Sequence, residues 1–279
     1  MSMNYGFDED AALKAKESDP TAYILGVNSK LPTTIIRPDG QWPDILYEPQ
    51  AAKFETSGCT IWGMENQVEM FMKEVFGFEP NYDERFTYLH CNVNPSIGAD
   101  PQNAYESARH DGLIPNELMP NTLADFLDKK YLTPLRMSAG KEWVGRFELL
   151  HDWLTDTTKE TIKSALALSP IAIAVTAWSQ DEHGLYVDRG MRNTHWCVAR
   201  GYVSEYNGVK GIILKVFDTY DYSTKYLHPN HRISMAKRIY IKERDELTEE
   251  QGAWILQKLK EILVALNDSF RRVRIGLGL

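Results

Sequence analysis

The sequence predicts an α+β protein, because its two halves have different apolar patterns. From Ile61 to Val75, apolar residues recur every three or four positions, which is typical of one face of a helix. After Pro170 the run IAIAVTAW is rich in β-branched residues, and two further runs, THWCVARGYVSEY and GVKGIILKVFD, meet around Asn207-Gly208. An Asn-Gly pair between two apolar runs is typical of a tight β-hairpin. We therefore expect a helical first half and an antiparallel sheet in the second.

The helical half begins after an irregular segment. Residues 1–41 contain several prolines and turn signals, so we expect this stretch to wrap over the protein rather than to form a domain. The first strong helix should start at Thr60 and end near Gly77, with Cys59 at its N-terminal edge. Start and stop signals predict four more helices, at Asp83 to Cys91, Pro101 to His110, Asn121 to Lys129 and Thr157 to Leu168.

The domain limits follow from these patterns. We expect one domain over residues 42–245, with a helical lobe at about 42–168 and a sheet lobe at about 169–245 that includes the strand KRIYIK (237–242). Residues 246–279 should form a separate C-terminal amphipathic helix, because a capping box at 248–251 precedes a regular apolar stripe. That stripe should pack on its own domain, on a second copy of the chain or on an assembly partner.

Composition narrows the classes of function. The formal charge is −8 and no basic run is dense, so nucleic acid is not an expected partner. No signal peptide and no apolar run of membrane-spanning length is visible, so we expect a soluble cytoplasmic protein with no membrane partner. The three cysteines form no CxxC pair, which favours free thiols in a reducing compartment.

Cys59 is the candidate nucleophile. A cysteine at the first turn of a helix faces unpaired N–H groups and the positive end of the helix dipole, and both stabilise a thiolate. We therefore expect a lowered pKa for Cys59. The preceding polar residues Glu55, Thr56 and Ser57 are interpreted as helix-start chemistry rather than as catalysts.

Two residues of the predicted hairpin could complete a catalytic set. His195 begins one strand and Asp218 ends the next, and antiparallel pairing brings the start of one strand beside the end of its neighbour. A thiol nucleophile needs such a base, and the base needs a third group to orient it. A metal site is the alternative, built from His195 and Cys197 with Asp218 or His183, but only one close-spaced ligand pair exists. We expect no metal and no cofactor.

These residues resemble the papain-like cysteine peptidases, in particular divergent bacterial and bacteriophage-type members. The resemblance covers roughly residues 42–242 and lies in the helix-start cysteine, the helical lobe, and the string His-Trp-x-Val-x-x-Gly-Tyr. It implies a two-lobed fold with a β-barrel-like sheet lobe, and Cys59 facing His195 across a cleft. It also implies that Gln50 donates to the oxyanion. The chain departs from the family because Gln50 precedes the cysteine by more residues, Cys-Trp becomes Cys-Thr-Ile-Trp, and Asp218 replaces an asparagine.

The expected function is hydrolysis of peptide or isopeptide bonds in a peptide or protein substrate. Cys59 would attack the carbonyl, His195 would protonate the leaving amine, and Asp218 would orient His195. One alternative is a non-catalytic structural or binding protein on the same fold, such as a component of a viral particle. Another is different thiol acyl transfer, such as amidase or transglutaminase chemistry.

Overall fold

The computed structural model describes residues 7, 9–18, 29–51, 54–119, 126–190, 194–221 and 223–244. The chain divides into two units, Met1–Lys242 and Glu243–Leu279, and nearly all the described residues belong to the first. The C-terminal helix expected within 246–279, with its oligomer or assembly partner, lies outside the described residues.

Six α-helices are described. α2 begins at Cys59 and ends before Gly77, whose positive φ of 74° closes it, as the sequence predicts. The helices expected near 83–91, 101–110 and 157–168 are also present, each begun by a side-chain cap. The bounds are α1 Glu9–Ser18, α2 Cys59–Phe76, α3 Glu84–Cys91, α4 Pro101–Asp111, α5 Pro134–Arg146 and α6 Lys159–Ala165.

The sequence prediction differs from the structure in three helical regions. α1 lies in the segment expected to wrap, and α5 was not expected. Most of the helix expected at 121–129 lies outside the described residues, but its described end is a turn followed by the 3-10 helix Lys129–Tyr131. The Asp128 side chain accepts from the backbone N–H of Lys130, which stabilises this short turn rather than the end of a longer helix.

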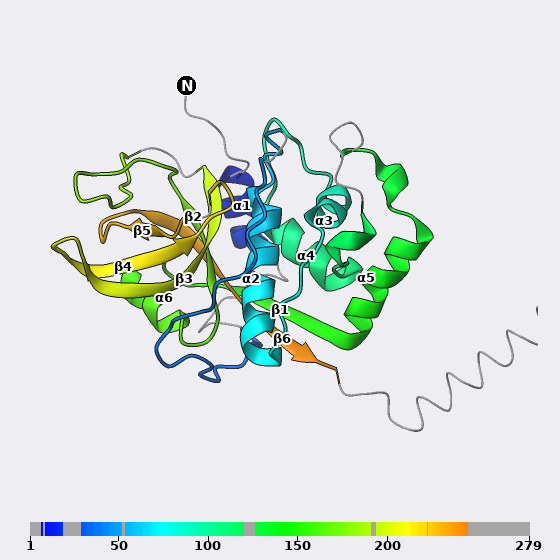
Figure 1. Ribbon diagram of the computed structural model, residues 1–279, viewed down its shortest axis with the longest axis horizontal. Helices are drawn as coiled ribbons and strands as arrows, with labels where there is room; N and C mark the ends of the chain where they lie inside the picture. The colour runs from blue at the N-terminus through cyan, green and yellow to red at the C-terminus, as the bar shows by residue number, and fades with distance from the viewer. Residues whose placement is uncertain are drawn as a thin grey trace, which may run out of the picture. The chain divides into compact units, whose positions relative to one another are not determined.

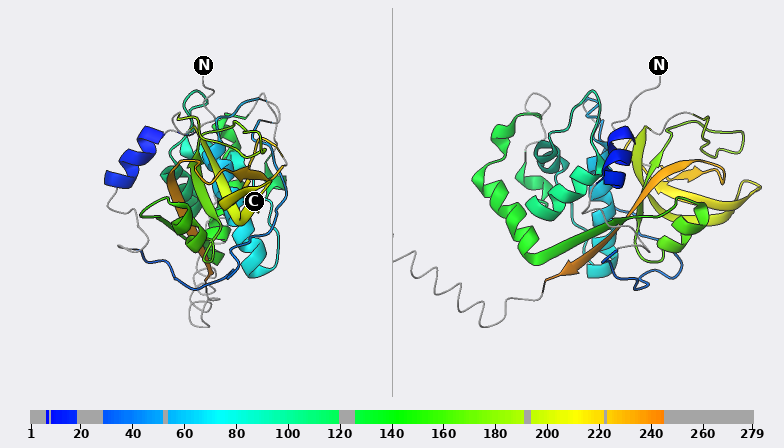
Figure 2. Two further views of the ribbon diagram at one scale, coloured as in Figure 1. Left: turned by 90° about the vertical axis from the view of Figure 1, so that its left-hand side faces the viewer. Right: turned by 180° about the vertical axis from the view of Figure 1, so that it is seen from behind.

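The strands form one sheet in the order β1-β6-β2-β3-β4-β5. β2 pairs antiparallel with both β6 and β3, and β4 pairs antiparallel with β3 and β5. β1 joins the sheet beside β6 although the sequence placed its residues in the helical lobe (Figure 2). The bounds are β1 Phe147–Trp153, β2 Ile171–Val175, β3 His195–Tyr206, β4 Val209–Phe217, β5 Lys225–Leu227 and β6 Ile233–Glu243.

α2 stands between the sheet and helices α3, α4 and α5 (Figure 1). Its residues from Cys59 to Met72 are all buried, because it packs on both sides. The contact with β3 is close at Gly63, where a Cβ atom would lie 2.7 Å from the Cδ1 atom of Trp196. Only glycine allows this approach, which fixes the first turn of α2 beside the start of β3.

A buried ion pair joins the sheet to the N-terminal part of the chain. Arg238 of β6 donates to both carboxylate oxygens of Asp152 in β1, at 3.1 and 2.7 Å. Arg238 also donates to the carbonyl of Pro32, and the Ser29 hydroxyl donates to Asp152. These bonds hold the segment around Ser29 and Pro32 against β1 and β6, which lie far from it in the sequence.

Within the described residues, no helix is both long enough and apolar enough to cross a membrane.

Candidate active site

A tight turn places Cys59 at the start of α2. Ser57 has a positive φ of 52°, and Gly58 follows as the helix N-cap. A Cβ atom on Gly58 would lie 2.5 Å from the Trp62 ring, so the turn requires glycine there. The Thr56 hydroxyl accepts from the Gly58 N–H and donates to the carbonyl of Gln50. The loop is therefore fixed by its own polar groups before the cysteine begins the helix.

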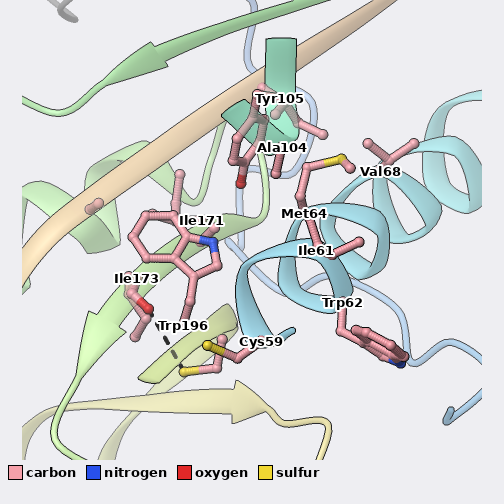
Figure 3. Close-up of a cluster of buried hydrophobic side chains, with 14 of the residues drawn as sticks. Cys59, Ile61, Trp62, Met64, Val68, Ala104, Tyr105, Ile171, Ile173 and Trp196 are labelled. Atoms are coloured by element: carbon pink, nitrogen blue, oxygen red, sulfur yellow. Dashed lines mark hydrogen bonds between the residues drawn. The ribbon is translucent and has the colours of Figure 1, made fainter. Parts of the chain in front are cut away.

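Cys59 is fully buried against β3. Figure 3 shows its side chain at the first turn of α2, near Trp196. Burial raises the pKa of the thiol, although backbone N–H groups of Trp196 and Thr60 bond to it and oppose that rise. The lowered pKa expected from the helix start is therefore wrong for this conformation, because loss of water outweighs the helix N–H groups.

The other two cysteines are also poor thiolates here. Burial raises the pKa of Cys91 to about 12 and raises that of Cys197 well above its ordinary value. The dashed line in Figure 3 marks the contact from the Cys197 sulfur to the carbonyl of Ile173, at 4.0 Å. Cys197 thus lies in the sheet interior near Cys59, while Cys91 is half-buried at the end of α3.

The hairpin brings His195 and Asp218 together. Val198 of β3 pairs with Phe217 of β4, so the start of one strand lies beside the end of the other. The Nε2 atom of His195 lies 2.5 Å from Oδ1 of Asp218, and both side chains are buried. Oδ1 also accepts from the backbone N–H of Thr219 at 2.9 Å. This arrangement fixes the plane of the imidazole.

A lysine completes the surroundings of Asp218. The Nζ atom of Lys225 lies 2.9 Å from Oδ2 of Asp218 and 2.5 Å from Oδ2 of Asp221. Burial alone would raise the pKa of Asp218, but His195 and Lys225 outweigh it and hold that pKa at about 2. Asp218 is therefore a carboxylate at any pH near neutrality.

Gln50 belongs to the same cluster. Its backbone N–H donates to the carbonyl of Thr219, and its Oε1 atom accepts from the Thr219 hydroxyl at 2.7 Å. Its Nε2 atom donates to the Tyr220 hydroxyl at 2.8 Å and to Glu55 at 3.2 Å. The structure thus brings the glutamine to the loop that follows Asp218, with its amide engaged by two neighbours.

Aromatic rings cover the histidine. The rings of Trp178 and Tyr220 lie 5.5 and 5.3 Å from the His195 ring, and the His195 side chain has no exposed surface. The Tyr220 hydroxyl donates to Glu55 at 2.6 Å, which ties the cover to the loop before α2. The Phe7 ring stacks on the ring of Trp196, the residue after His195, with 5.6 Å between the ring centroids. The described conformation is therefore closed to solvent at both Cys59 and His195.

Sequence reasoning missed the roles of three residues. Glu55 accepts from the Ser57 N–H and from Tyr220, so it belongs to the site as well as to the helix start. The pair Thr219-Tyr220 directly after Asp218 was a visible signal for Tyr220. Nothing in the sequence marks Lys225, because lysines are usually exposed and only the folded structure shows the partners of a buried one.

For the metal alternative, the described part of the chain holds no cluster of three or more His, Cys, Asp or Glu side chains arranged for a metal ion.

Comparisons in sequence find no relatives. No protein-family model matches the chain, and no curated protein matches it.

Comparisons of structure find many matches among solved proteins. Procathepsin L 3 from the larval midgut of Tenebrio molitor matches with a TM-score of 0.56 and 14% identity, over 85% of this chain and 76% of that one. The cysteine protease and lectin-like domains of Cwp84, a surface layer associated protein of Clostridium difficile, match with a TM-score of 0.59 and 11% identity, over 86% of this chain and 61% of that one.

A third match is the proform of Amb a 11, a cysteine protease and ragweed pollen allergen. Its TM-score is 0.52 at 15% identity, over 79% of this chain and 69% of that one. At such identities the likeness establishes architecture alone. The helices on one side of α2 and the six-stranded sheet on the other agree with it. The chain therefore has the α+β fold of the papain-like cysteine proteases.

Proposed function

We propose that this chain is a thiol hydrolase that cleaves peptide or isopeptide bonds through Cys59, His195 and Asp218. The observation that carries the proposal is the buried 2.5 Å bond between His195 and Asp218, placed at the strand against which the helix-start cysteine packs. A thiol, a base and a carboxylate that orients the base are the groups that nucleophilic acyl transfer needs, and the burial of Cys59 and of the His195–Asp218 pair supports this assignment.

The hydrogen bonds support a proposed role for each atom of the set. Asp218 engages Nε2 of His195, so Nδ1 is the nitrogen that would take the proton from the Cys59 sulfur. The thiolate would then attack the carbonyl carbon, and the imidazolium would give its proton to the leaving amine. Water, deprotonated by the same imidazole, would attack the acyl-enzyme and release the second product.

The oxyanion would be held at the start of α2. The backbone N–H of Cys59 belongs to the helix end that stabilises negative charge. Gln50 would supply a second donor through Nε2, which in the described conformation bonds to Tyr220 and Glu55. We infer that substrate exchanges one of these bonds for the oxyanion.

Because the site is closed to solvent, we propose that the Cys59 thiolate forms only when substrate binds. Because burial raises the pKa of Cys59, the resting sulfur is a neutral thiol in this conformation. Substrate must displace part of the aromatic cover to reach His195, and we propose that proton transfer from the Cys59 sulfur to His195 accompanies this opening.

A vinyl-sulfone or epoxide probe tests the proposal. We expect covalent labelling of Cys59, found by peptide mapping, and loss of labelling in His195→Ala. Cys197→Ser is the matched control, because it removes the other buried thiol, which lies on the strand of His195, and should leave the Cys59 adduct in place. Labelling confined to the half-buried Cys91 would contradict the assignment.

A second candidate is a non-catalytic binding protein on the same fold. The full burial of Cys59 and His195 favours it, since neither group meets solvent in the described conformation. An intact protein that no thiol probe labels at Cys59, even under mild warming that opens the cover, would support this role. Amidase or transglutaminase chemistry would instead show Cys59 labelling with turnover of glutamine amides rather than of peptides.

A further inference from the structure

We propose that Lys225 is a positioning residue of the catalytic set: its ammonium holds the second oxygen of Asp218, so that the first oxygen stays on His195. This inference rests on the proposed function, because it assigns Lys225 a part in the same site. Lys225 is the first residue of β5, and its side chain is 1% exposed.

The bonding of Asp218 gives each of its oxygens a separate partner. Oδ1 meets Nε2 of His195 and the N–H of Thr219, while Oδ2 faces Nζ of Lys225 at 2.9 Å. This carboxylate cannot rotate about its bond to Cβ without losing either the bond to His195 or the close ion pair with Lys225. Without Lys225, Oδ2 would be a buried anionic oxygen without its counter-charge, and the group would turn toward any other donor.

Lys225 is itself held in place from three sides. Asp221 takes its second bond at 2.5 Å, and the rings of Trp178 and Tyr186 lie 5.3 and 5.6 Å from Nζ. Trp178 also covers His195, so the lysine connects the carboxylate to the aromatic cover of the histidine. An ammonium near aromatic faces and between two carboxylates has little freedom to move.

A purely structural role explains this lysine less well. Replacing a buried ion pair by apolar side chains is often neutral or stabilising, so such a pair is weak evidence for stability. Here the pair is placed on the one carboxylate that orients the imidazole. A buried cation there also favours the deprotonated forms of the groups around it. The titratable groups that pair with Lys225 or share its field are Asp218, Asp221, Tyr47, Tyr186 and Cys197, and His195 bonds to the other oxygen of Asp218.

The test compares Lys225→Met with wild type by steady-state kinetics on a peptide substrate. We expect kcat to fall about 10-fold to 100-fold with little change in KM, since a misplaced imidazole harms chemistry rather than binding. Both limbs of the pH–rate profile should move to higher pH by about one unit, because a nearby positive charge is lost. Lys225→Arg should restore the wild-type limbs. Lys215→Met is the control, because Lys215 bonds to Gln41 and not to the site.

A double variant separates positioning from independent packing. If Lys225 acts through Asp218, Lys225→Met should have little further effect on kcat in an Asp218→Asn background. An unchanged kcat and pH profile in Lys225→Met would overturn the proposal, and so would an equal loss in both backgrounds. Lys225→Gln, which removes the charge but keeps a polar side chain, serves where the Met variant folds poorly. It should show the same shift of the limbs.

One readout does not depend on peptidase activity. The Asp218 carboxyl, followed by carbon NMR in the full chain, should titrate at higher pH in Lys225→Met than in wild type by about one unit. If the wild type proves inactive and its Cys59 is not labelled, the proposed function fails. The titration still tests whether Lys225 acts on the Asp218 carboxylate. An unchanged pKa of Asp218 in a folded Lys225→Met variant would overturn the proposed role of Lys225, whatever the enzyme assay shows.

Discussion

At the scale of single residues, the orientation of His195 depends on an oxygen at position 218. Asp218→Asn keeps a carbonyl that can accept from Nε2, so we expect it to retain more activity than Asp218→Ala. The neutral amide would lose the ion pair with Lys225, which should still cost about 10-fold in kcat/KM. Steady-state kinetics at one pH check both. Equal loss in the two variants would mean that charge, rather than orientation, is what the histidine needs.

A carboxyl at the start of α3 should make stability depend on pH. Burial raises the pKa of Asp83 to about 7, against the opposing bond from the Phe86 N–H. The folded value is above the ordinary 3.8, so this stabilisation is complete below about pH 4 and is lost as pH rises through 7. Asp83→Asn lacks this titration. Relative to wild type, its free energy of unfolding should therefore rise by up to about 4 kcal/mol between pH 4 and pH 8.

Urea denaturation at several pH values measures the Asp83 effect. The comparison at pH 4 is the internal control, because the wild-type carboxyl is then protonated in the folded protein and resembles the amide. A difference between the two proteins that stays constant from pH 4 to pH 8 would contradict the assignment.

The residue scale also shows what sequence reasoning could reach. A helix start predicted the place of Cys59 at the first turn of α2, and a hairpin predicted that His195 lies beside Asp218. The pKa of the cysteine did not follow, because helix-start geometry is visible in a sequence and the extent of burial is not. Lys225 was missed for the same reason, since its partners come from the tertiary fold.

At the scale of elements, the contact between α2 and β3 controls the site. Gly63→Ala would place a Cβ atom 2.7 Å from the Trp196 ring and 3.3 Å from its carbonyl, so the helix must shift from the strand. We expect a loss of about 1–3 kcal/mol in stability and slower probe labelling of Cys59. Gly145→Ala in α5 is the matched control, because no atom lies within 4 Å of its Cβ position. The unfolding temperature and the labelling rate should fall for Gly63→Ala alone, since Ala in place of Gly145 favours the helix.

Elements with strong local signals were predicted and elements without them were not. The β3–β4 hairpin turns at Asn207 and Gly208, both with positive φ, as their identities predict. α5 was missed because only Gly140 and Trp143 of its thirteen residues are buried, which leaves no apolar stripe. β1 was missed because FELLHDW alternates at its start and is then buried on both faces. Neither pattern favours one period over the other.

At the scale of the whole molecule, the buried pair of Arg238 and Asp152 should be a major support. Arg238→Ala leaves a buried carboxylate beside Ser29 without its counter-charge, and we expect a loss of about 3–5 kcal/mol. Arg37→Ala is the control, since its pairs with Asp39 and Glu74 are partly exposed and such pairs contribute about 1 kcal/mol or less each. Chemical denaturation of both variants measures the difference. Similar losses in the two would show that the buried pair is not a special support.

Other expectations at this scale remain predictions. The cytoplasmic or virion location, the bacterial or bacteriophage origin and any assembly partner stand on the sequence alone. The limits of the domain at 42–245 also rest on the sequence alone. The positions of α1 and β1 show that helices and strands are less separated along the chain than the sequence predicts.

The anchoring of Arg238 also bears on how the protein is made. Arg238 bonds to Asp152, 86 positions earlier, and to Ser29, 209 positions earlier. During synthesis the sheet therefore cannot close until β6 has left the ribosome, and contacts between such distant segments form slowly. His195 and Asp218 are translated before β6 but lie in the sheet that it completes. We expect the growing chain to carry an unassembled site until β6 has been made, so that the proposed peptidase could not act on a neighbouring polypeptide before then.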